Sequence, residues 1–582
     1  MFAIPIASHL NLYKFAQKRD KCAMIQQNFI KLYESSFRDH WDLPAFSDYT
    51  EKTTYTYAQF AEEIAKLHLL FEEMKLEKGD KVALIGRNNI QWATVYMAAV
   101  TYGAVIVPIL QDFTPNDIHH IVNHSDSVIL FTGDNIWENL EEEEFENLRG
   151  IFSLTDYRVL NQHNASKATN AGKKAAEQFA KRYPQGFTKE DIHYADVSNE
   201  EIALINYTSG TTGFSKGVML TGNNLAGNVV FGINSRLHYK GSRCLSFLPL
   251  AHAYGCAFDY LVPLAVGTHI TLLGKIPSPK IILEAFAQVK PHLICSVPLV
   301  MEKIYKKNIL PQLNKRTLRW ALNIPLLDQT IYKKIRQKMV DSFGGNFEQI
   351  IIGGAPLNKE VEDFLYKIKF PFTIGYGMTE CGPLISYTHW SEFIPGSAGR
   401  ILPDIMQVKI DSPDPQSVPG EILIKGENVM KGYYKNEEAT NAVLDKEGWL
   451  HTGDMGTTDF DDTIFIRGRS KTMILGASGQ NIYPEEIEAK LNNLPFVMES
   501  LIIEKDGKLV ALVYPDYGAA DGFGLAPDDL PIAMEENRKT LNKLVAPYEA
   551  VSAIRLYPTE FEKTPKKSIK RYLYNSILDK ES

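Results

Sequence analysis

Short apolar runs alternate with helix-length segments through the first 350 residues of the chain. Residues 81–85 (KVALI) follow Gly79-Asp80, residues 92–100 have the length of a helix, and residues 104–110 form a second apolar run. This alternation favours parallel sheets covered by helices. We therefore predict an α/β multidomain protein whose large N-terminal domain contains two α/β subdomains. Further strand-like runs of this kind occupy residues 127–131, 202–205, 292–296 and 349–352.

Two further segments complete the predicted N-terminal domain. Residues 164–182 are polar and rich in Ala and Lys, which predicts an exposed helix linking the two blocks. From about residue 401 the pattern changes to short strands with turns, as in GEILIKG (residues 420–426) and TTDFDDTIFIRG (residues 457–468). We expect a small β-barrel-like subdomain there.

A compact α+β unit follows. Residues 484–494 (PEEIEAKLNNL) predict a helix, because proline and two glutamates suit its first turn. Asp506-Gly507 predicts a hairpin, and residues 517–528 look like a surface loop. We place the boundary between the large and the small domain at 468–471, which divides the chain into residues 1–467 and 472–582.

Composition narrows the classes of function. The chain of 582 residues is too long for one hydrophobic core. A net charge of −8 without a long basic run argues against a nucleic-acid partner. Five cysteines without a CxxC pair argue for reduced thiols in the cytoplasm. We expect no signal peptide and no membrane-spanning segment. The sequence does not decide whether the protein contacts the inner face of the membrane peripherally or forms a homodimer.

The segment YTSGTTGFSKG, residues 207–217, has a composition suited to phosphate binding. It is not the GxxxxGK[ST] loop, because Ser215 stands five residues after Gly210 and Lys216 is followed by Gly217. Residues 217–220 predict a strand, and a helix can begin only after Thr221. The loop is therefore predicted to lie between two strands. A plain Gly/Thr surface turn is the alternative.

Five further motifs follow this loop in a fixed order. Together, the six resemble the adenylate-forming (AMP-binding) superfamily, over residues 79–571, and within it the bacterial long-chain fatty-acid–CoA ligases. The resemblance implies two steps: ATP-dependent activation of a fatty acid to acyl-AMP with release of pyrophosphate, then transfer to coenzyme A. It also implies ATP, Mg²⁺ and coenzyme A as cofactors. The motifs are FLPLAHAYG (247–255), GGAPL (353–357), GYGMTECG (375–382), GWLHTGD (448–454) and RGRSKTMILGASGQNIYPEEIE (467–488).

The resemblance assigns roles around the triphosphate. Pyrophosphate departure builds negative charge, so cations and fixed donors are needed there. Mg²⁺ would be held by Thr211 and Glu380, which offer the oxygen ligands that this ion prefers. The phosphate-binding residues implied are Thr208, Ser209, Gly210, Thr211, Thr212, Gly213 and Lys216.

Other motif residues would bind the rest of the nucleotide and the acid. Tyr376 would stack on adenine, Asp454 would hold the ribose with help from Arg469, and His252 would lie beside the substrate carboxylate. Tyr376 and His252 have an alternative as ordinary core residues. Small residues of the glycine-rich motifs would line the space for the base and the acyl chain. They are Gly353, Gly354, Ala355, Gly375, Gly377 and Thr379.

The resemblance also implies a mobile C-terminal domain that rotates about a hinge between the two half-reactions, with Lys471 as the hinge residue. Gly476 and Gly479 would line the tunnel for the pantetheine arm. One departure concerns the C-terminal lysine that assists adenylation in the superfamily, because Ser568 occupies its place. Lys567 is our candidate substitute, with Lys570 as the alternative.

Two rival functions keep the same motifs. One is a fatty-acyl-AMP ligase that loads a carrier protein. The other is a weakly active sensor of acyl chains or nucleotide, suggested by Ser568. His119, His120 and His124 belong to no motif, and we assign them to the surface of a helix.

Overall fold

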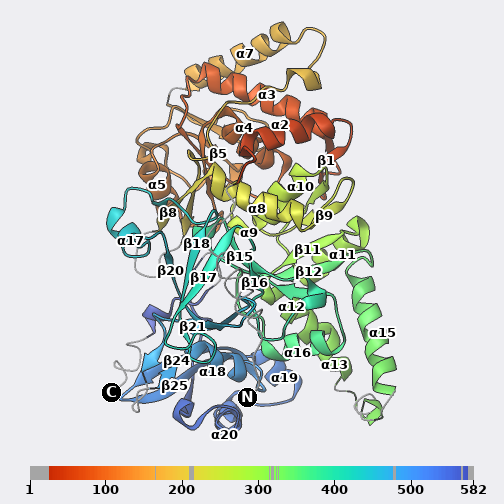
Figure 1. The fold of residues 1–582 in the computed structure, drawn as a ribbon, viewed down its shortest axis with the longest axis vertical. Helices are drawn as coiled ribbons and strands as arrows, with labels where there is room; N and C mark the ends of the chain where they lie inside the picture. Colours follow the sequence, from red (N-terminus) through yellow and green to blue (C-terminus); the bar gives the residue numbers. More distant parts are fainter. Residues whose placement is uncertain are drawn as a thin grey trace, which may run out of the picture.

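The computed structural model describes residues 25–163, 165–208, 215–313, 315, 320–322, 324, 327–475, 480–564 and 568–574. Figure 1 shows the two α/β subdomains in the upper and middle parts, a β-rich layer beside them, and the C-terminal unit at the lower end. This arrangement confirms the predicted α/β multidomain architecture.

The first subdomain is built on a seven-stranded sheet with the order β19-β8-β7-β4-β3-β5-β6. Its central strands are parallel, whereas β7, β8 and β19 pair antiparallel at one edge. Strands β4 and β5 are buried along their whole length, as parallel strands covered by helices are. The strands are β3 Lys81–Ile85, β4 Val105–Ile109, β5 Ser127–Thr132, β6 Gly150–Ser153, β7 Ile202–Thr208, β8 Lys216–Thr221 and β19 Gly432–Tyr433.

The second subdomain contains a four-stranded sheet, β2-β1-β10-β9, and a three-stranded parallel sheet, β11-β12-β13. The backbone N–H of His292 donates to the carbonyl of Arg243 (2.9 Å), which joins the two sheets. The strands are β1 Pro44–Asp48, β2 Thr54–Thr56, β9 Arg243–Ser246, β10 His269–Leu272, β11 Leu293–Ser296, β12 Gln349–Ile352 and β13 Phe372–Ile374.

Helices α2, α3, α4, α8 and α10 contact one another and both subdomain sheets, forming a shared core. Trp92 and Tyr96 of α4 pack against Tyr260, and all three side chains are fully buried. These buried aromatic side chains fasten the two subdomains together. The helices are α2 Phe29–Asp39, α3 Tyr57–Glu73, α4 Ile90–Tyr102, α5 Pro115–His124, α8 Gly222–Asn234, α9 Ala253–Cys256, the π-helical η3 Ala257–Leu261, and α10 Val262–Ala265.

The predicted linking helix is α7, Ala165–Arg182, at the top of Figure 1. It packs on α3 through three buried alanines, Ala168, Ala171 and Ala175, and its other side chains are exposed or half-buried. The segment is therefore a mostly exposed helix, as predicted. It connects β6 to β7 of the same seven-stranded sheet, so the prediction that it links two α/β blocks was wrong.

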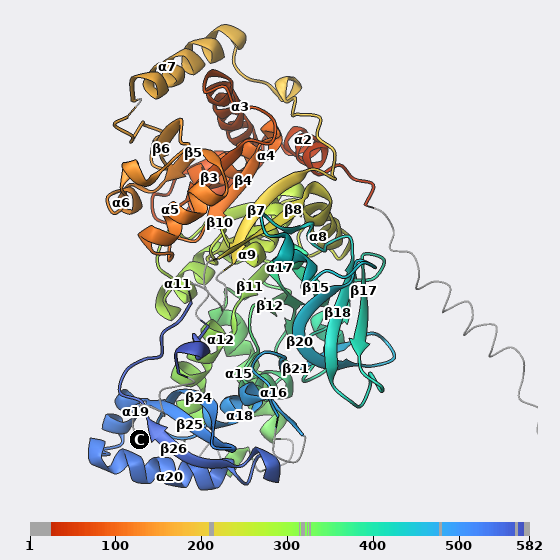
Figure 2. The same cartoon turned by 90° about the vertical axis from the view of Figure 1, so that its left-hand side faces the viewer.

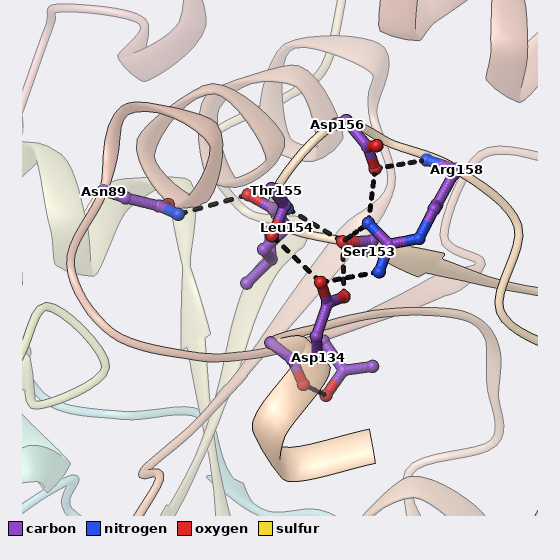
Figure 3. A network of polar contacts seen from close by, with 9 residues as sticks. Asn89, Asp134, Ser153, Leu154, Thr155, Asp156 and Arg158 are labelled. Atoms are coloured by element: carbon purple, nitrogen blue, oxygen red, sulfur yellow. Dashed lines mark hydrogen bonds and ion pairs between the residues drawn. The ribbon is translucent and has the colours of Figure 1, made fainter. Parts of the chain in front are cut away.

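A polar network holds the end of β6 to the short helix α6, Asp134–Trp137 (Figure 3). Asp134 accepts hydrogen bonds from Ser153 Oγ (2.6 Å) and Arg158 Nη2 (2.6 Å). Burial alone would raise the pKa of Asp134, but these two donors outweigh burial and lower it. The Asp134 carboxylate is thus fully engaged by protein donors, and we assign the network a structural role.

The β-rich part consists of a four-stranded antiparallel sheet, β17-β18-β20-β21, and a three-stranded sheet, β14-β15-β16. In the described part of the chain the four strands remain an open sheet, so the expected barrel-like subdomain is not a closed barrel. The strands are β14 Tyr376–Gly377, β15 Leu384–Tyr387, β16 Arg400–Ile401, β17 Met406–Asp411, β18 Gly420–Gly426, β20 Leu450–Thr458 and β21 Ile464–Arg469.

The C-terminal unit has its own sheet, β24-β25-β26, covered by α18 and α20. The predicted hairpin is confirmed, with Asp506 and Gly507 at positive φ (50° and 70°). The predicted loop at 517–528 is wrong in part, because Asp516 caps a short helix, α19. The elements are α18 Pro484–Leu491, β24 Val497–Lys505, β25 Lys508–Pro515, α19 Tyr517–Gly522, α20 Leu530–Leu541 and β26 Val551–Leu556.

A helical flank lies beside the second subdomain, with α15 along the right-hand edge of Figure 1. The rotated view in Figure 2 places α15 and α16 above the C-terminal sheet. The flank comprises α11 Pro279–Val289, α12 Pro298–Ile304, the π-helical η4 Tyr305–Ile309, α13 Leu310–Leu313, α15 Leu327–Ser342 and α16 Lys359–Lys367.

The hydrophobic clusters separate near the predicted boundary. The large cluster reaches Ile466, and a distinct cluster begins with Ile474 and Ile482. The four described cysteines, Cys244, Cys256, Cys295 and Cys381, are free and buried. Within the described ranges, no helix combines the length and hydropathy of a membrane span.

Candidate active site

The glycine- and threonine-rich loop connects two antiparallel strands, as predicted. Thr208 at the end of β7 pairs with Lys216 at the start of β8. Thr221 then caps α8 through a reciprocal capping box with Asn224. The predicted phosphate-binding residues Ser209, Gly210, Thr211, Thr212 and Gly213 lie outside the described residues.

His124 anchors the base of this loop. Its Nδ1 forms a 2.7 Å hydrogen bond with the hydroxyl of Tyr207, and burial lowers the pKa of the imidazole. The assignment of His124 to a helix surface was therefore wrong. The contact joins α5 to β7 across 83 residues, so no local motif could have revealed it.

Tyr433 connects the loop to Glu380. Strand β19 pairs with β8, which places the Tyr433 ring 5.0 Å from Lys216 Nζ. The Tyr433 hydroxyl donates to Glu380 Oε1 (2.9 Å). Burial first, and then the charge of Glu380, raise the pKa of Tyr433, so its hydroxyl stays protonated and remains a donor. Our sequence analysis missed Tyr433; the Gly432-Tyr433-Tyr434 run was the only local signal.

A second cluster brings together three predicted nucleotide-binding residues. The hydroxyl of Tyr376 donates to Asp454 Oδ2 (2.6 Å), and Arg469 Nε lies 2.8 Å from Asp454 Oδ1. Asp454 is 4% exposed. Burial raises its pKa and Arg469 opposes this, while the charge of Glu380 adds to the increase. Tyr376, which contacts Asp454, and Glu380, which contacts Tyr433, stand four residues apart in the same GYGMTECG segment, so this segment joins the two clusters.

The turn before Asp454 is held by Glu421 of β18. Gly453 adopts a positive φ of 70°, which favours glycine, and its N–H donates to Glu421 Oε1 (3.0 Å). The other oxygen of Glu421 lies 2.9 Å from His451 Nδ1. Glu421 therefore orients the strand that presents Asp454, a role that our sequence analysis did not assign.

The glycine motifs begin where parallel strands end. GGAPL follows β12 and GYGMTECG follows β13, so both emerge from the carboxyl edge of one sheet, the usual location of ligands in α/β folds. Gly354 has a left-handed φ of 87°. A Cβ at Gly377 would approach the carbonyl oxygen of Pro383 to 2.3 Å, so this position requires glycine.

The remaining residues of these motifs differ in exposure. Gly354 and Ala355 are exposed, Gly375 and Gly377 are half-buried, and Thr379 is buried beside Glu380. The exposed pair leaves open space in front of the strand ends.

His252 caps α9, and its Nδ1 accepts from the backbone N–H of Tyr254 (3.3 Å). The Tyr254 ring packs on Gly353, since a Cβ built at Gly353 would lie 3.4 Å from it. The Tyr254 hydroxyl donates to the carbonyl of Ile351 (3.0 Å). The segments FLPLAHAYG and GGAPL therefore meet, and half-buried His252 lies beside their junction.

The predicted hinge residue, Lys471, is exposed and follows Arg469 at the end of β21. Asn358, just after GGAPL, donates to Asn493 of the C-terminal unit (2.5 Å), so this unit contacts the edge of the site. The predicted tunnel residues Gly476 and Gly479 lie outside the described residues.

The described ends of the basic C-terminal segment pair antiparallel, Lys563 with Ile569. Thr564 N–H donates to the Ser568 carbonyl (2.8 Å), and exposed Ser568 occupies the place expected for lysine. Lys567 lies outside the described residues, whereas Lys570 lies 3.4 Å from Glu562. Lys570 is therefore already engaged within the C-terminal unit.

The described residues show one candidate Mg²⁺ ligand, Glu380, because Thr211 lies outside them. No group of three or more His, Cys, Asp or Glu side chains suited to a metal occurs among those residues. Glu380 is a half-buried carboxylate held by Tyr433, which fits an ion bound mainly by phosphate oxygens and water.

Comparison with known proteins settles the family. The profile of the family described as "AMP-binding enzyme" matches residues 33–434. The chain belongs to the AMP-binding enzyme family. This confirms the superfamily resemblance that the six motifs suggested.

Individual relatives of this AMP-binding enzyme act on different acids. The long-chain-fatty-acid–CoA ligase FadD15 of Mycobacterium bovis is 27% identical, covering 89% of this chain and 90% of its own. The 4-coumarate–CoA ligase 1 of Narcissus pseudonarcissus is also 27% identical, covering 88% and 87%. The ATP-bound structure of MatB from Rhodopseudomonas palustris shares the fold, with a TM-score of 0.73 at 21% identity over 94% of this chain and 98% of that one.

Proposed function

We propose that this enzyme is an AMP-forming long-chain fatty-acid–CoA ligase. In the first step, a carboxylate oxygen of the fatty acid attacks the α-phosphorus of ATP, and the bond to pyrophosphate breaks. In the second, the thiol of coenzyme A attacks the acyl carbonyl, the bond to AMP breaks, and the thiol proton is released. The family match supports an adenylate-forming ligase that uses ATP and coenzyme A.

The observation that carries this proposal is that the segment 375–382 joins two clusters, because its Tyr376 contacts Asp454 and its Glu380 contacts Tyr433. Lys216 and Tyr433 provide a cation and an oriented donor beside the loop, while Tyr376, Asp454 and Arg469 form a polar triad. Their chemistry matches two parts of one nucleotide: an anionic phosphate chain and a ribose with two hydroxyls. The donors are oriented by protein contacts before the nucleotide binds, so little reorganisation is needed as charge develops.

Around the triphosphate, Lys216 and the loop residues Thr208 to Gly213 would donate to phosphate oxygens. Glu380 and Thr211 would hold Mg²⁺, which neutralises phosphate charge when bound. On the acid side, His252 would orient the carboxylate, and Tyr254 with Gly353 would form the wall between the acyl chain and adenine.

For the second half-reaction we propose rotation about Lys471. The separate hydrophobic clusters on either side of residues 468–471 support two bodies that can move relative to each other. The loop containing Gly476 and Gly479 would then line the thiol path. Lys567 would supply the positive charge for adenylation, because Lys570 is paired with Glu562.

A second acid class deserves testing because 4-coumarate–CoA ligases match as well as fatty-acid ligases do. The test is thioester and AMP formation with ATP, Mg²⁺ and coenzyme A, using carboxylates from acetate to oleate together with 4-coumarate. We expect the highest kcat/KM with the long-chain acids. Preference for 4-coumarate would overturn the chain-length proposal and leave the ligase reaction intact.

The acceptor needs its own test, since fatty-acyl-AMP ligases share the first step. We expect thioester only when coenzyme A is present. Acyl-adenylate that accumulates despite coenzyme A would favour a carrier-loading ligase, and absence of adenylate with any acid would favour the sensor. We place the reaction in the cytoplasm, because the four cysteines in the described part of the chain are free, buried thiols.

A further inference from the structure

Helix α18 of the C-terminal unit is flanked by residues that contact the rest of the enzyme. Before the helix, Tyr483 packs so closely on Gly468 of β21 that a Cβ built at Gly468 would lie 2.9 Å from the Tyr483 ring. After the helix, half-buried Asn493 meets half-buried Asn358, which directly follows GGAPL. The C-terminal unit is therefore docked at both ends of α18, once beside the hinge and once at the edge of the active site.

The contact at the active-site edge has a fixed donor. The side-chain oxygen of Asn358 caps α16 by accepting from the backbone N–H groups of Glu360 (3.0 Å) and Val361 (3.4 Å). Its backbone N–H donates to Glu302 Oε1 of α12 (3.0 Å). Because the amide oxygen faces α16, the amide NH₂ points away from that helix, and it donates to Asn493 Oδ1 (2.5 Å). The large domain thus orients this donor independently of the C-terminal unit.

The same helix also holds the basic C-terminal segment. Glu488 is 8% exposed and pairs with Arg571, while its other oxygen accepts from the backbone N–H of Ile502 (2.6 Å). Glu485, one turn earlier, lies 3.7 Å from Arg571 and accepts from the hydroxyl of Thr472 (2.7 Å), the residue after the predicted hinge. Helix α18 therefore connects the hinge, the basic segment and the contact with Asn358 as one rigid element.

We infer that Asn493 is a positioning residue for adenylation. Its hydrogen bond to Asn358 holds the C-terminal unit in the orientation in which α18 brings the basic segment to the site. Rotation for the thioester step must break this bond, because Asn358 belongs to the large domain and Asn493 to the unit that rotates. The inference rests on the proposed two-step function and identifies the contact that favours the first step.

The test measures the two half-reactions separately in the full chain. ATP–pyrophosphate exchange reports adenylation, and a single turnover of preformed acyl-adenylate with coenzyme A reports thioester formation. Asn493→Ala should lower the exchange rate roughly fivefold, the factor that one net hydrogen bond contributes to an equilibrium, and should leave the thioester rate unchanged. Asn493→Asp keeps the acceptor oxygen and should retain exchange. Equal loss in both half-reactions, or loss confined to the thioester step, would overturn the inference.

The preceding residue supplies a matched control. Asn492 accepts from Ser500 Oγ (2.8 Å), a contact that stays within the C-terminal unit. Asn492→Ala removes the same amide one position away, so the ratio of the two rates should stay at the wild-type value. A ratio shifted as far as in Asn493→Ala would show that the split arises from general loosening of the unit and would overturn the inference. A wild type without any exchange would refute the proposed function itself, and this inference with it.

A crosslink tests the same contact in the opposite direction. Asn358→Cys and Asn493→Cys, combined with Cys22→Ser, place two reactive thiols at the contact, since the four described native cysteines are buried. Joining them with a short bismaleimide should preserve exchange relative to the same variant before crosslinking and abolish thioester formation. Loss of exchange with thioester formation intact would show that this orientation serves the second step and would contradict the assignment to adenylation.

Discussion

Removing one hydroxyl, in Tyr433→Phe, should slow adenylation. The substitution keeps the ring that Lys216 contacts and removes only the donor to Glu380. A hydrogen bond to a charged group contributes about 1.5–3 kcal/mol, and Tyr433 is only 7% exposed, so water cannot readily replace the lost donor. Glu380 itself is half-buried, which favours the lower value. Since about 1.4 kcal/mol corresponds to a factor of ten in rate, we expect Tyr433→Phe to lower kcat/KM for adenylation about tenfold.

The neighbouring residue supplies a matched control. The hydroxyl of Tyr434 also donates to a carboxylate, Asp126 Oδ2 (2.8 Å), and consecutive side chains of an extended segment point in opposite directions. Tyr434→Phe should therefore leave adenylation unchanged. The assay is ATP–pyrophosphate exchange at saturating acid, with Mg²⁺ varied. Equal effects of the two substitutions, or an unchanged rate for Tyr433→Phe, would refute the assigned role.

Three further predictions concern binding and stability. Asp454→Ala should raise the KM for ATP about 10- to 100-fold in the exchange assay, because a charged hydrogen-bonding group is lost; an unchanged KM would contradict the ribose assignment. Arg571→Ala should destabilise the C-terminal unit by about 3 kcal/mol in urea unfolding, because Glu488 is left buried without its partner. Adding Glu488→Gln should restore part of that loss, and no restoration would refute the pairing argument. Burial raises the pKa of Asp259 to about 8 in the folded state. Between about pH 4 and pH 8 the folded protein therefore holds a proton on Asp259 that the unfolded chain has released. The free energy of unfolding falls as the pH rises from about 4 to about 8. Asp259→Asn should remove that slope, worth on the order of 5 kcal/mol by pH 9; identical slopes in both proteins would contradict it.

Local patterns predicted many of the elements well. The strand at residues 81–85 matches β3 because Gly79-Asp80 marks its start, and the helix at Pro484 matches α18 because its first turn carries suitable residues. The same reasoning failed at residues 517–528, where glycine and alanine suggested a loop. There, the Asp516 cap and tertiary packing outweigh weak propensity.

The site could be predicted only as far as motifs extend. Tyr376 and Asp454 each stand in a recognisable motif, yet their 2.6 Å contact joins residues 78 positions apart. Tyr433 and His124 act through partners that only the sheet pairing brings near. Such residues are invisible to local periodicity, because their role depends on which strands become neighbours.

The most direct test of the central claim follows the oxygen of the substrate. If the carboxylate attacks the α-phosphorus and the thiol then displaces AMP, one carboxylate oxygen must remain on AMP. With a long-chain fatty acid labelled with ¹⁸O in both carboxyl oxygens, mass spectrometry should find one ¹⁸O in AMP and none in pyrophosphate. Label in pyrophosphate or inorganic phosphate, or unlabelled AMP accompanying thioester formation, would contradict activation through an acyl-adenylate.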